Sequence, residues 1–419
     1  MNRSITRVLR PRAGRRLPPK LRARRVGSIA REIPGGVRSA EFEHLLSRID
    51  EDAPIHKGNH VEIFFEGEKA VSAMIESIRE SEREILIEAY IFQDDSTGHR
   101  FLEALRQAAS RGVVVRVMAD AWGSITTRAS FWRAMRESGI DVRLFNRLFG
   151  SLLWQPFRDH RKVMVVDRRV AFTGGMNIGD AYARFFGRSG FDAMRDTHVR
   201  IEGPAAWELV AVFAESWEWA AEEASIQGSP RHAGSEDGAR ILVLDSRPGR
   251  GYRETAAVLA ATVGAARESV WITNAYFAPH RLTVSILGQA ARRGIDVRLL
   301  LPGITDVPIV RHAGHGWYAR LLDRGVRIFE YQPAILHAKT VVADGFVSVI
   351  GSTNLDFRSF RFNAECNVVI MDETVGRSMR DLFERDLRDS LEIDPAEWRS
   401  RGGMRRVADR LAGLLTPLL

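Results

Sequence analysis

Two histidines, each followed two positions later by a lysine, are the residues of this 419-residue chain best suited to chemistry. An aspartate follows each lysine after five positions, so the pattern H-x-K-x4-D occurs twice. The two copies are His160, Lys162, Asp167 and His337, Lys339, Asp344. A Gly-x-x-Asn sequence follows each copy and ends at Asn177 or Asn354. One His-x-Lys is a weak signal, whereas two copies with matching flanks indicate a functional site.

The spacing favours chemistry on a phosphodiester. Residues i and i+2 of a strand face the same way, so each histidine shares a face with its lysine. If two halves of the chain pack about a pseudo-twofold axis, both pairs meet in one cleft. The lysines would then neutralise phosphate oxygens while one imidazole attacks phosphorus and the other protonates the leaving alcohol. Asn177 and Asn354 could add hydrogen-bond donors to the phosphate.

A metal site is the main chemical alternative, because two histidines with aspartates could bind Zn²⁺. A lysine beside each histidine argues against it, since a second cation is unwelcome next to a metal. We therefore expect no metal and no other cofactor at the paired motif. Four further histidines have no duplicate partner and are expected on the surface or in loops: His198, His280, His312 and His315.

The elements around the motif also repeat. Tyr90, Gly112, Gly139 and His160 recur 177 to 186 positions later as Tyr276, Gly294, Gly325 and His337. This nearly constant offset indicates a duplicated domain. Apolar strands alternate with helical patterns in both halves, which predicts two tandem α/β/α domains with mixed, mostly parallel sheets flanked by helices. A monomer with an internal pseudo-dimer follows.

Composition sets the expected domain boundaries. The net charge of +8 comes from residues 1–31, which hold eleven Lys and Arg without Asp or Glu, leaving 50 basic and 53 acidic residues elsewhere. A basic arm on a near-neutral body suits an anionic membrane surface better than nucleic acid. A solvated arm without a partner is the alternative. The predicted units are a disordered arm (1–40), an N-terminal domain (41–228), a linker (229–239), a C-terminal domain (240–395) and an amphipathic helix (396–419).

Other features concern location. No run of 18 apolar residues and no secretory signal is present, and the single cysteine, Cys366, fits a reducing compartment. The first half carries extra apolar residues at 146–159 and around Phe185 and Phe186, interpreted as a lipid-contacting rim or as ordinary loop packing. The C-terminal helix could lie on a membrane or pack on the body.

With both motifs intact, the chain resembles the phospholipase D superfamily from about Val61 to Met371. The stretches 88–98, 195–204 and 336–359 resemble bacterial cardiolipin synthases, and the lack of N-terminal membrane helices resembles the B type. The resemblance implies metal-free, two-step phosphatidyl transfer with His160 as nucleophile and His337 as acid and base, or with these roles exchanged. It also implies that Glu365 orients His160 and Asp196 orients His337, while Asp167 and Asp344 brace the fold around the lysines.

The function expected from this resemblance is a cardiolipin synthase that transfers a phosphatidyl group to phosphatidylglycerol through a phosphohistidine. The alternatives are a phospholipase D that releases phosphatidic acid and, less favoured, a nuclease of the same fold. The enzyme would sit peripherally on the cytoplasmic face of a bacterial inner membrane and bind phospholipid, with no nucleic acid expected.

Overall fold

The computed structural model describes residues 18–49, 53–146, 157–183, 190–221, 237–247, 252–402, 409 and 412–413. Three elements precede the first domain: α2 (Pro19–Arg31), the 3-10 turn η1 (Gly36–Arg38) and α3 (Ala40–Ile49). The first half then comprises β1 (Ile55–Phe64), α4 (Gly67–Glu80), β2 (Glu84–Ala89), α5 (Ser96–Ser110), β3 (Val114–Asp120), α6 (Ala129–Glu137), β4 (Asp141–Phe145), β5 (Arg158–Asp159), β6 (Lys162–Val166), β7 (Val170–Gly174), α7 (Asp180–Ala183), β8 (Gly190–Arg195), β9 (His198–Glu202) and α8 (Ala205–Ala221).

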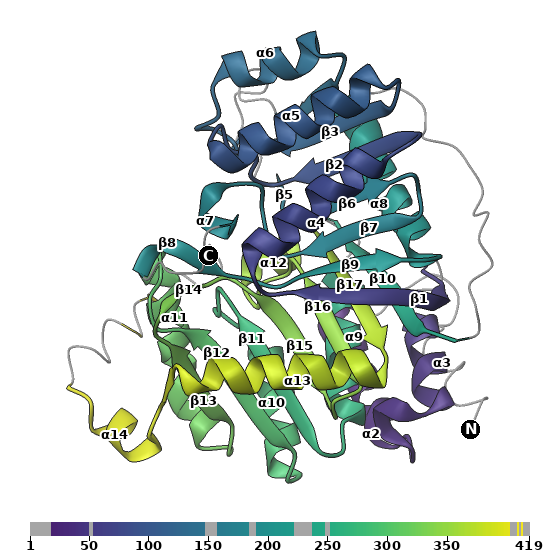
Figure 1. Ribbon diagram of the computed structural model, residues 1–419. Helices are drawn as coiled ribbons and strands as arrows, with labels where there is room; N and C mark the ends of the chain where they lie inside the picture. Colours follow the sequence, from purple (N-terminus) through teal and green to yellow (C-terminus); the bar gives the residue numbers. More distant parts are fainter. Residues whose placement is uncertain are drawn as a thin grey trace.

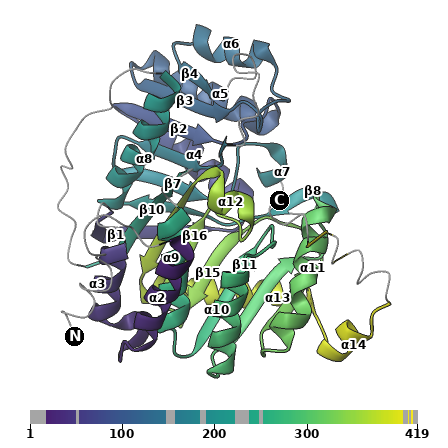
Figure 2. The same cartoon turned by 180° about the vertical axis from the view of Figure 1, so that it is seen from behind.

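The second half repeats this order. It comprises β10 (Ala239–Ser246), α9 (Tyr252–Ala265), β11 (Ser269–Asn274), α10 (Arg281–Arg292), β12 (Asp296–Pro302), α11 (Pro308–Leu322), β13 (Arg327–Tyr331), β14 (Ala334–Leu336), β15 (Lys339–Ala343), β16 (Val347–Gly351), α12 (Phe357–Arg361), β17 (Asn363–Met371), α13 (Glu373–Arg388), β18 (Ser390–Glu392) and α14 (Pro395–Ser400). Figures 1 and 2 show the halves one above the other, with helices on both sides of the sheet.

The strands of the two halves form one continuous sheet. Its order is β4-β3-β2-β6-β7-β9-β1 in the first half and β10-β17-β16-β15-β11-β12-β13 in the second, joined by the antiparallel β1–β10 pair. Corresponding strands thus lie at equal distances from the junction, which confirms the predicted pair of α/β domains. Parallel pairing joins β2–β3–β4 and β11–β12–β13, where helices connect the strands. The motif strands β6 and β15 pair antiparallel with both neighbours.

Matched turns explain why the duplicated sequence folds twice in the same way. The glycines predicted to end helices, Gly112 and Gly139, have φ of +88° and +82°, and their counterparts Gly294 and Gly325 have +88° and +86°. This left-handed conformation suits glycine and stops a helix before the next strand. Asp95 caps the start of α5 by accepting a hydrogen bond from the Gly98 N–H at 2.9 Å.

The predicted disordered arm (1–40) is wrong for residues 18–40, where the structure has α2, η1 and the first residue of α3. Ala23, Val26 and Ala30 lie on one face of α2 and are fully buried, while the arginines between them lie on other faces. Arg22 is paired with Glu254 of α9 at 2.7 Å. The many charged residues of this segment obscured its apolar residues, which recur at helical spacing. These apolar residues pack against the second half.

Several other predictions fall partly or wholly outside the described residues. They are the extra segment 147–156, the loop 184–189, the linker up to residue 236 and most of the C-terminal helix. Within the described part, α14 ends at Ser400 and is followed by a bend, so the helix predicted over 396–419 is not continuous at its start. Among the described helices, none combines the length and apolar character needed to cross a membrane.

Close contact between α2 and α9 gives a test of the first correction. A Cβ atom added at Gly264 of α9 would lie 2.6 Å from the Gly27 carbonyl oxygen of α2. We expect Gly264→Ala to lower the free energy of unfolding by about 1–3 kcal/mol, because overpacking forces the helices apart. Urea denaturation measures the change. Gly288→Ala in α10 is the control, since its Cβ meets only the flexible Arg324 side chain, and it should stay within about 1 kcal/mol of the parent. Equal stabilities would mean that α2 is not docked on α9.

Candidate active site

The two histidines enter the site on short strands that pair with the opposite half. β5 runs parallel to β17, and the His160 N–H donates to the Ala364 carbonyl oxygen at 2.9 Å. β14 runs parallel to β8, and the His337 N–H donates to the Arg195 carbonyl oxygen at 2.7 Å. Main-chain hydrogen bonds to the other half therefore fix the position of each motif histidine.

That register places a carboxylate beside each imidazole. Glu365 follows Ala364, and its Oε2 lies 2.9 Å from His160 Nδ1. Asp196 follows Arg195, and its Oδ2 lies 2.6 Å from His337 Nδ1. The carboxylate partners predicted for the two histidines are thus confirmed as contacts. Because a carboxylate only accepts, the Nδ1 of each imidazole carries a proton, and Nε2 is the nitrogen available for attack or proton transfer. His337 Nδ1 also lies 2.8 Å from Lys339 Nζ.

The lysines lie beside the imidazoles in the same buried space. Lys162 Nζ donates to the His160 carbonyl oxygen at 2.6 Å, and Lys339 Nζ donates to the His337 carbonyl oxygen. Burial lowers the pKa of Lys162 to about 7 and that of Lys339 to about 8. The Lys339 charge also contributes to lowering the pKa of Lys162.

The pKa shifts of the other site groups fit this arrangement. Burial lowers the pKa of His160 to about 4 against the opposing effect of Glu365, so its imidazole is neutral at pH 7. Burial and the Lys339 charge also lower the pKa of His337. Burial alone would raise the pKa of Glu365 and of Asp196, but the adjacent histidine and lysine hold both values below the ordinary range. The site therefore holds charged carboxylates, one of them beside the neutral imidazole of His160.

Tyrosine rings lie beside the histidines. The Tyr90 ring lies 4.9 Å from the His160 ring, and the Tyr182 ring lies 5.5 Å from the His337 ring, edge to face. Asn177 donates from Nδ2 to the Tyr182 hydroxyl at 2.7 Å and accepts from the Ile91 N–H at 3.1 Å. This asparagine therefore positions a tyrosine in the structure, and its predicted role as phosphate donor gains no support. Asn354 is buried near the site, and its phosphate role stays a prediction.

The sequence pattern groups Asp167 and Asp344 with the motif histidines and lysines, but both aspartates contact the backbone of a neighbouring strand. Asp167 accepts backbone N–H bonds from Glu82, Arg83 and Glu84 at 2.8–2.9 Å, at the end of β6 away from Lys162. Asp344 does the same for Arg267, Glu268 and Ser269 at 2.8–2.9 Å. Their φ values are +52° and +51°. Both aspartates thus brace the strand next to the motif strand, as the resemblance implied.

His198 lies close to the site, contrary to the expectation of a surface or loop histidine. Its side chain is buried, its Nδ1 has no hydrogen-bond partner within the described residues, and burial lowers its pKa to about 4. A Cβ added at Gly174 would lie 2.8 Å from this nitrogen, so the glycine after the motif makes room for it. Its position two residues after Asp196 was the available sequence signal.

Arg161, between the first histidine and lysine, was also missed. It is almost fully buried and pairs with Asp245 of the second half, with Glu88 of the first half 3.6 Å away. Arg195 similarly binds Asp386 of α13 at 2.7 Å. These buried ion pairs connect the halves directly behind the two histidines.

One group among the described residues has the composition of a metal site. His312, His315 and Asp409 place their ligand atoms within 4.8 Å of one another, and His315 Nε2 also lies 3.0 Å from Glu330. The group joins α11 to the C-terminal segment and contains neither motif histidine. Arg401 already pairs with Asp409 at 3.2 Å.

Comparisons with known proteins agree with this geometry. The family described as "Cardiolipin synthase, PLD-like domain" matches residues 74–217 and 259–387, one segment in each half. The chain belongs to this family. It is 32% identical to cardiolipin synthase 1 of Bacillus cereus over 92% of this chain and 78% of that protein. It is 35% identical to cardiolipin synthase A of Pseudomonas fluorescens over 87% of this chain and 76% of that protein.

These relatives are named type 1 and type A, so the likeness to the B type stays a prediction. Among solved structures, the phosphatidylserine synthase of Haemophilus influenzae superimposes with a TM-score of 0.69 at 12% identity. That match covers 89% of this chain and all of the other, and it confirms the two-domain fold.

A structural role for the motif aspartates predicts a variant that loses stability but not chemistry. Asp344→Ala leaves three backbone N–H groups without an acceptor, and unpaired buried donors are costly. We expect the free energy of unfolding to fall by about 2–4 kcal/mol in urea denaturation. The kcat of the folded variant, measured at low temperature, should match the parent. A large loss of kcat at unchanged stability would return Asp344 to the catalytic set.

The lowered lysine pKa values predict an alkaline limb. As pH rises through about 7 to 8, the ammonium groups lose the charge that binds phosphate, so kcat/KM should fall. The measurement is a pH profile of kcat/KM with a soluble phosphodiester. In Lys339→Arg the guanidinium stays charged, so whatever activity remains should decline less steeply over this range. A constant kcat/KM up to pH 9.5 in the parent would contradict the assignment.

Proposed function

We propose that this chain is a cardiolipin synthase that condenses two molecules of phosphatidylglycerol into cardiolipin and glycerol. The observation that carries the proposal is a pair of imidazoles, each with a free Nε2 and a carboxylate on Nδ1, flanked by two buried lysines. Family membership supports the choice of phosphatidyl transfer among the reactions that such a pair can perform.

In the first step, His160 Nε2 attacks phosphorus of one phosphatidylglycerol. The N–P bond forms as the P–O bond to the terminal glycerol breaks. His337 enters this step as an imidazolium, with Asp196 holding its Nδ1–H, and gives its Nε2 proton to the leaving oxygen. Glu365 stabilises the positive charge that develops on His160, and the two lysines neutralise the phosphate oxygens. Exchanging the histidine roles gives the same balance, because the site is nearly symmetric.

In the second step, His337 Nε2 takes the proton of a hydroxyl of the second phosphatidylglycerol. That oxygen attacks phosphorus, the P–N bond breaks, and His160 is regenerated. The phosphohistidine conserves the energy of the original diester, so a lipid alcohol can replace water as acceptor. The buried site, with both histidines less than 10% exposed, favours transfer over hydrolysis by limiting water.

The proposed location is the cytoplasmic face of the inner membrane, with peripheral attachment. The basic residues of α2 that remain outside its buried face support contact with anionic lipid, at roughly 1 kcal/mol for each Lys or Arg near the surface.

Incubation with phosphatidylglycerol vesicles tests the activity. We expect cardiolipin and glycerol in equal amounts. His160→Ala and His337→Ala should each reduce kcat by roughly 10³-fold or more, and the double variant should be no worse than either, because the two groups act as a unit. His280→Ala is the control, since His280 only caps α10 and should retain full activity.

The products separate the alternatives. Phosphatidic acid as the main product would identify a phospholipase D instead. Inertness towards lipid together with DNA cleavage would identify a nuclease. Substantial activity in either histidine variant would contradict a single shared site.

A further inference from the structure

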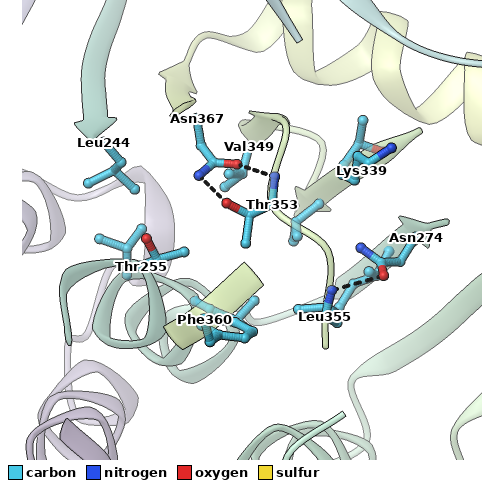
Figure 3. Close-up of a pocket in the computed structure, with 14 residues that line it drawn as sticks. Leu244, Thr255, Asn274, Lys339, Val349, Thr353, Leu355, Phe360 and Asn367 are labelled. Carbon is cyan, nitrogen blue, oxygen red and sulfur yellow. Dashed lines mark hydrogen bonds between the residues drawn. The ribbon is translucent and has the colours of Figure 1, made fainter. Parts of the chain in front are cut away.

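An apolar cavity begins beside Lys339 and runs along the sheet of the second half. It has a volume of about 50 Å³. Strands β10, β11, β15, β16 and β17 and helices α9 and α12 supply lining residues. Its apolar walls include Leu244, Leu259, Val349 and Phe360. Figure 3 labels Leu244, Val349 and Phe360 among the lining residues, with Lys339 and Asn274 on the opposite side of the view from Leu244.

Asn367, Thr353 and Asn274 in the walls bond to neighbouring residues, while the Thr255 hydroxyl has no hydrogen-bond partner among the described residues. Asn367 donates to the Thr353 hydroxyl at 2.7 Å and accepts from the Thr353 N–H at 3.3 Å. Asn274 accepts from the Leu355 N–H at 3.0 Å. Figure 3 marks these bonds as dashed lines. Few donors or acceptors are left for water, and a cavity without polar partners stays dry and takes apolar guests.

The first half shows that this cavity is specific to one domain. Phe172 occupies the position two residues before the Gly-x-x-Asn glycine, where the second half has Val349. In the first half, Phe64 of β1 pairs with His198 of β9, which in turn lies opposite Gly174. In the second half, Leu244 of β10 pairs with Asn367 of β17, which lies opposite Gly351. The Phe64 and Phe172 rings stack with centroids 6.4 Å apart.

Methionines complete the filling of the first half. Met164 follows Lys162 by two residues, where Val341 follows Lys339, and Met176 precedes Asn177, where Thr353 precedes Asn354. All four residues of the first half, Phe64, Met164, Phe172 and Met176, are buried in one apolar cluster. At these four positions the first half thus carries larger side chains than the second half, where the corresponding residues line or flank the cavity.

We propose that this cavity receives the start of one acyl chain of the phosphatidyl group being transferred, while the phosphate of that group lies at Lys162 and Lys339. The inference rests on the proposed function, because an alkyl tail on the bound phosphate supplies the occupant. The cavity is apolar, narrow and continuous with a phosphate-binding lysine, which are the properties that a chain attached to a phosphate requires. The filled counterpart in the first half leaves the second phospholipid without such a slot, so the two substrates bind unequally.

Size sets the expected length dependence. An apolar cavity of roughly 150 Å³ takes up a benzene ring, so this smaller one fits only a few methylene groups of a single chain. Each buried methylene should raise affinity by up to about fourfold, and the gain should stop when the cavity is full.

Binding of n-alkyl phosphates, from methyl to octyl, tests this without requiring turnover. Isothermal titration with the full chain should show affinity rising over the first methylene groups and then levelling. Val349→Phe copies the first half and should flatten this rise while leaving methyl phosphate affinity unchanged. Val349→Ala enlarges the cavity and should extend the rise to longer chains. If Val349→Phe unfolds, Leu244→Phe narrows the same cavity from the neighbouring wall.

The outcomes distinguish the two proposals. An unchanged length dependence in both Val349→Phe and Val349→Ala, or none in the parent, would overturn the acyl slot. Parent protein that binds alkyl phosphates with the expected length dependence but makes no cardiolipin would overturn the proposed function instead. With phosphatidylglycerols of increasing chain length, Val349→Phe should also lose the rise in kcat/KM while keeping the kcat of the shortest substrate.

Discussion

The structure depends on two buried imidazole–carboxylate pairs that cross between the halves. Glu365 of the second half binds His160 of the first, and Asp196 of the first half binds His337 of the second. A buried charge without its partner is strongly destabilising, so neither half satisfies its own carboxylate alone. The β5–β17 and β14–β8 pairings and the Arg161–Asp245 and Arg195–Asp386 ion pairs hold the same interface closed. The same contacts therefore hold the two halves together and position the side chains of the site.

Duplication gives the site its two similar halves, and small departures from symmetry give them different tasks. His198 and Asn367 occupy equivalent positions opposite the Gly-x-x-Asn glycines. The Nδ1 of His198 has no hydrogen-bond partner among the described residues, whereas the Asn367 amide is bonded to Thr353. The first half is filled by phenylalanine and methionine where the second half keeps a cavity beside Lys339. In the proposed reaction, the two halves would present the donor and acceptor lipids with different surroundings.

The N-terminal segment shows how charge and packing coexist. Its arginines suggested a disordered arm, but α2 places Ala23, Val26 and Ala30 against α9 and leaves basic groups on its other faces. Small residues allow the close approach of α2 and α9, because a Cβ atom on Gly264 would lie only 2.6 Å from the Gly27 carbonyl oxygen. The basic residues are thereby fixed to the second half, the half that carries the cavity.

The sequence by itself determined the repeated elements, the motif residues and the family, because periodicity, turn glycines and paired motifs are local or repeated signals. It also named both carboxylate partners through the family resemblance, and the bracing role of Asp167 and Asp344 followed in the same way. Tertiary structure alone decided the role of Asn177, the burial of His198 and Arg161, and the docking of α2. These depend on which side chains meet across elements far apart in the chain. The cavity is the clearest case. Val349 and Phe172 each lie two residues before a glycine, and the sequence indicates a buried strand residue at both positions. Only the packing of the folded chain shows that a cavity lies beside Val349.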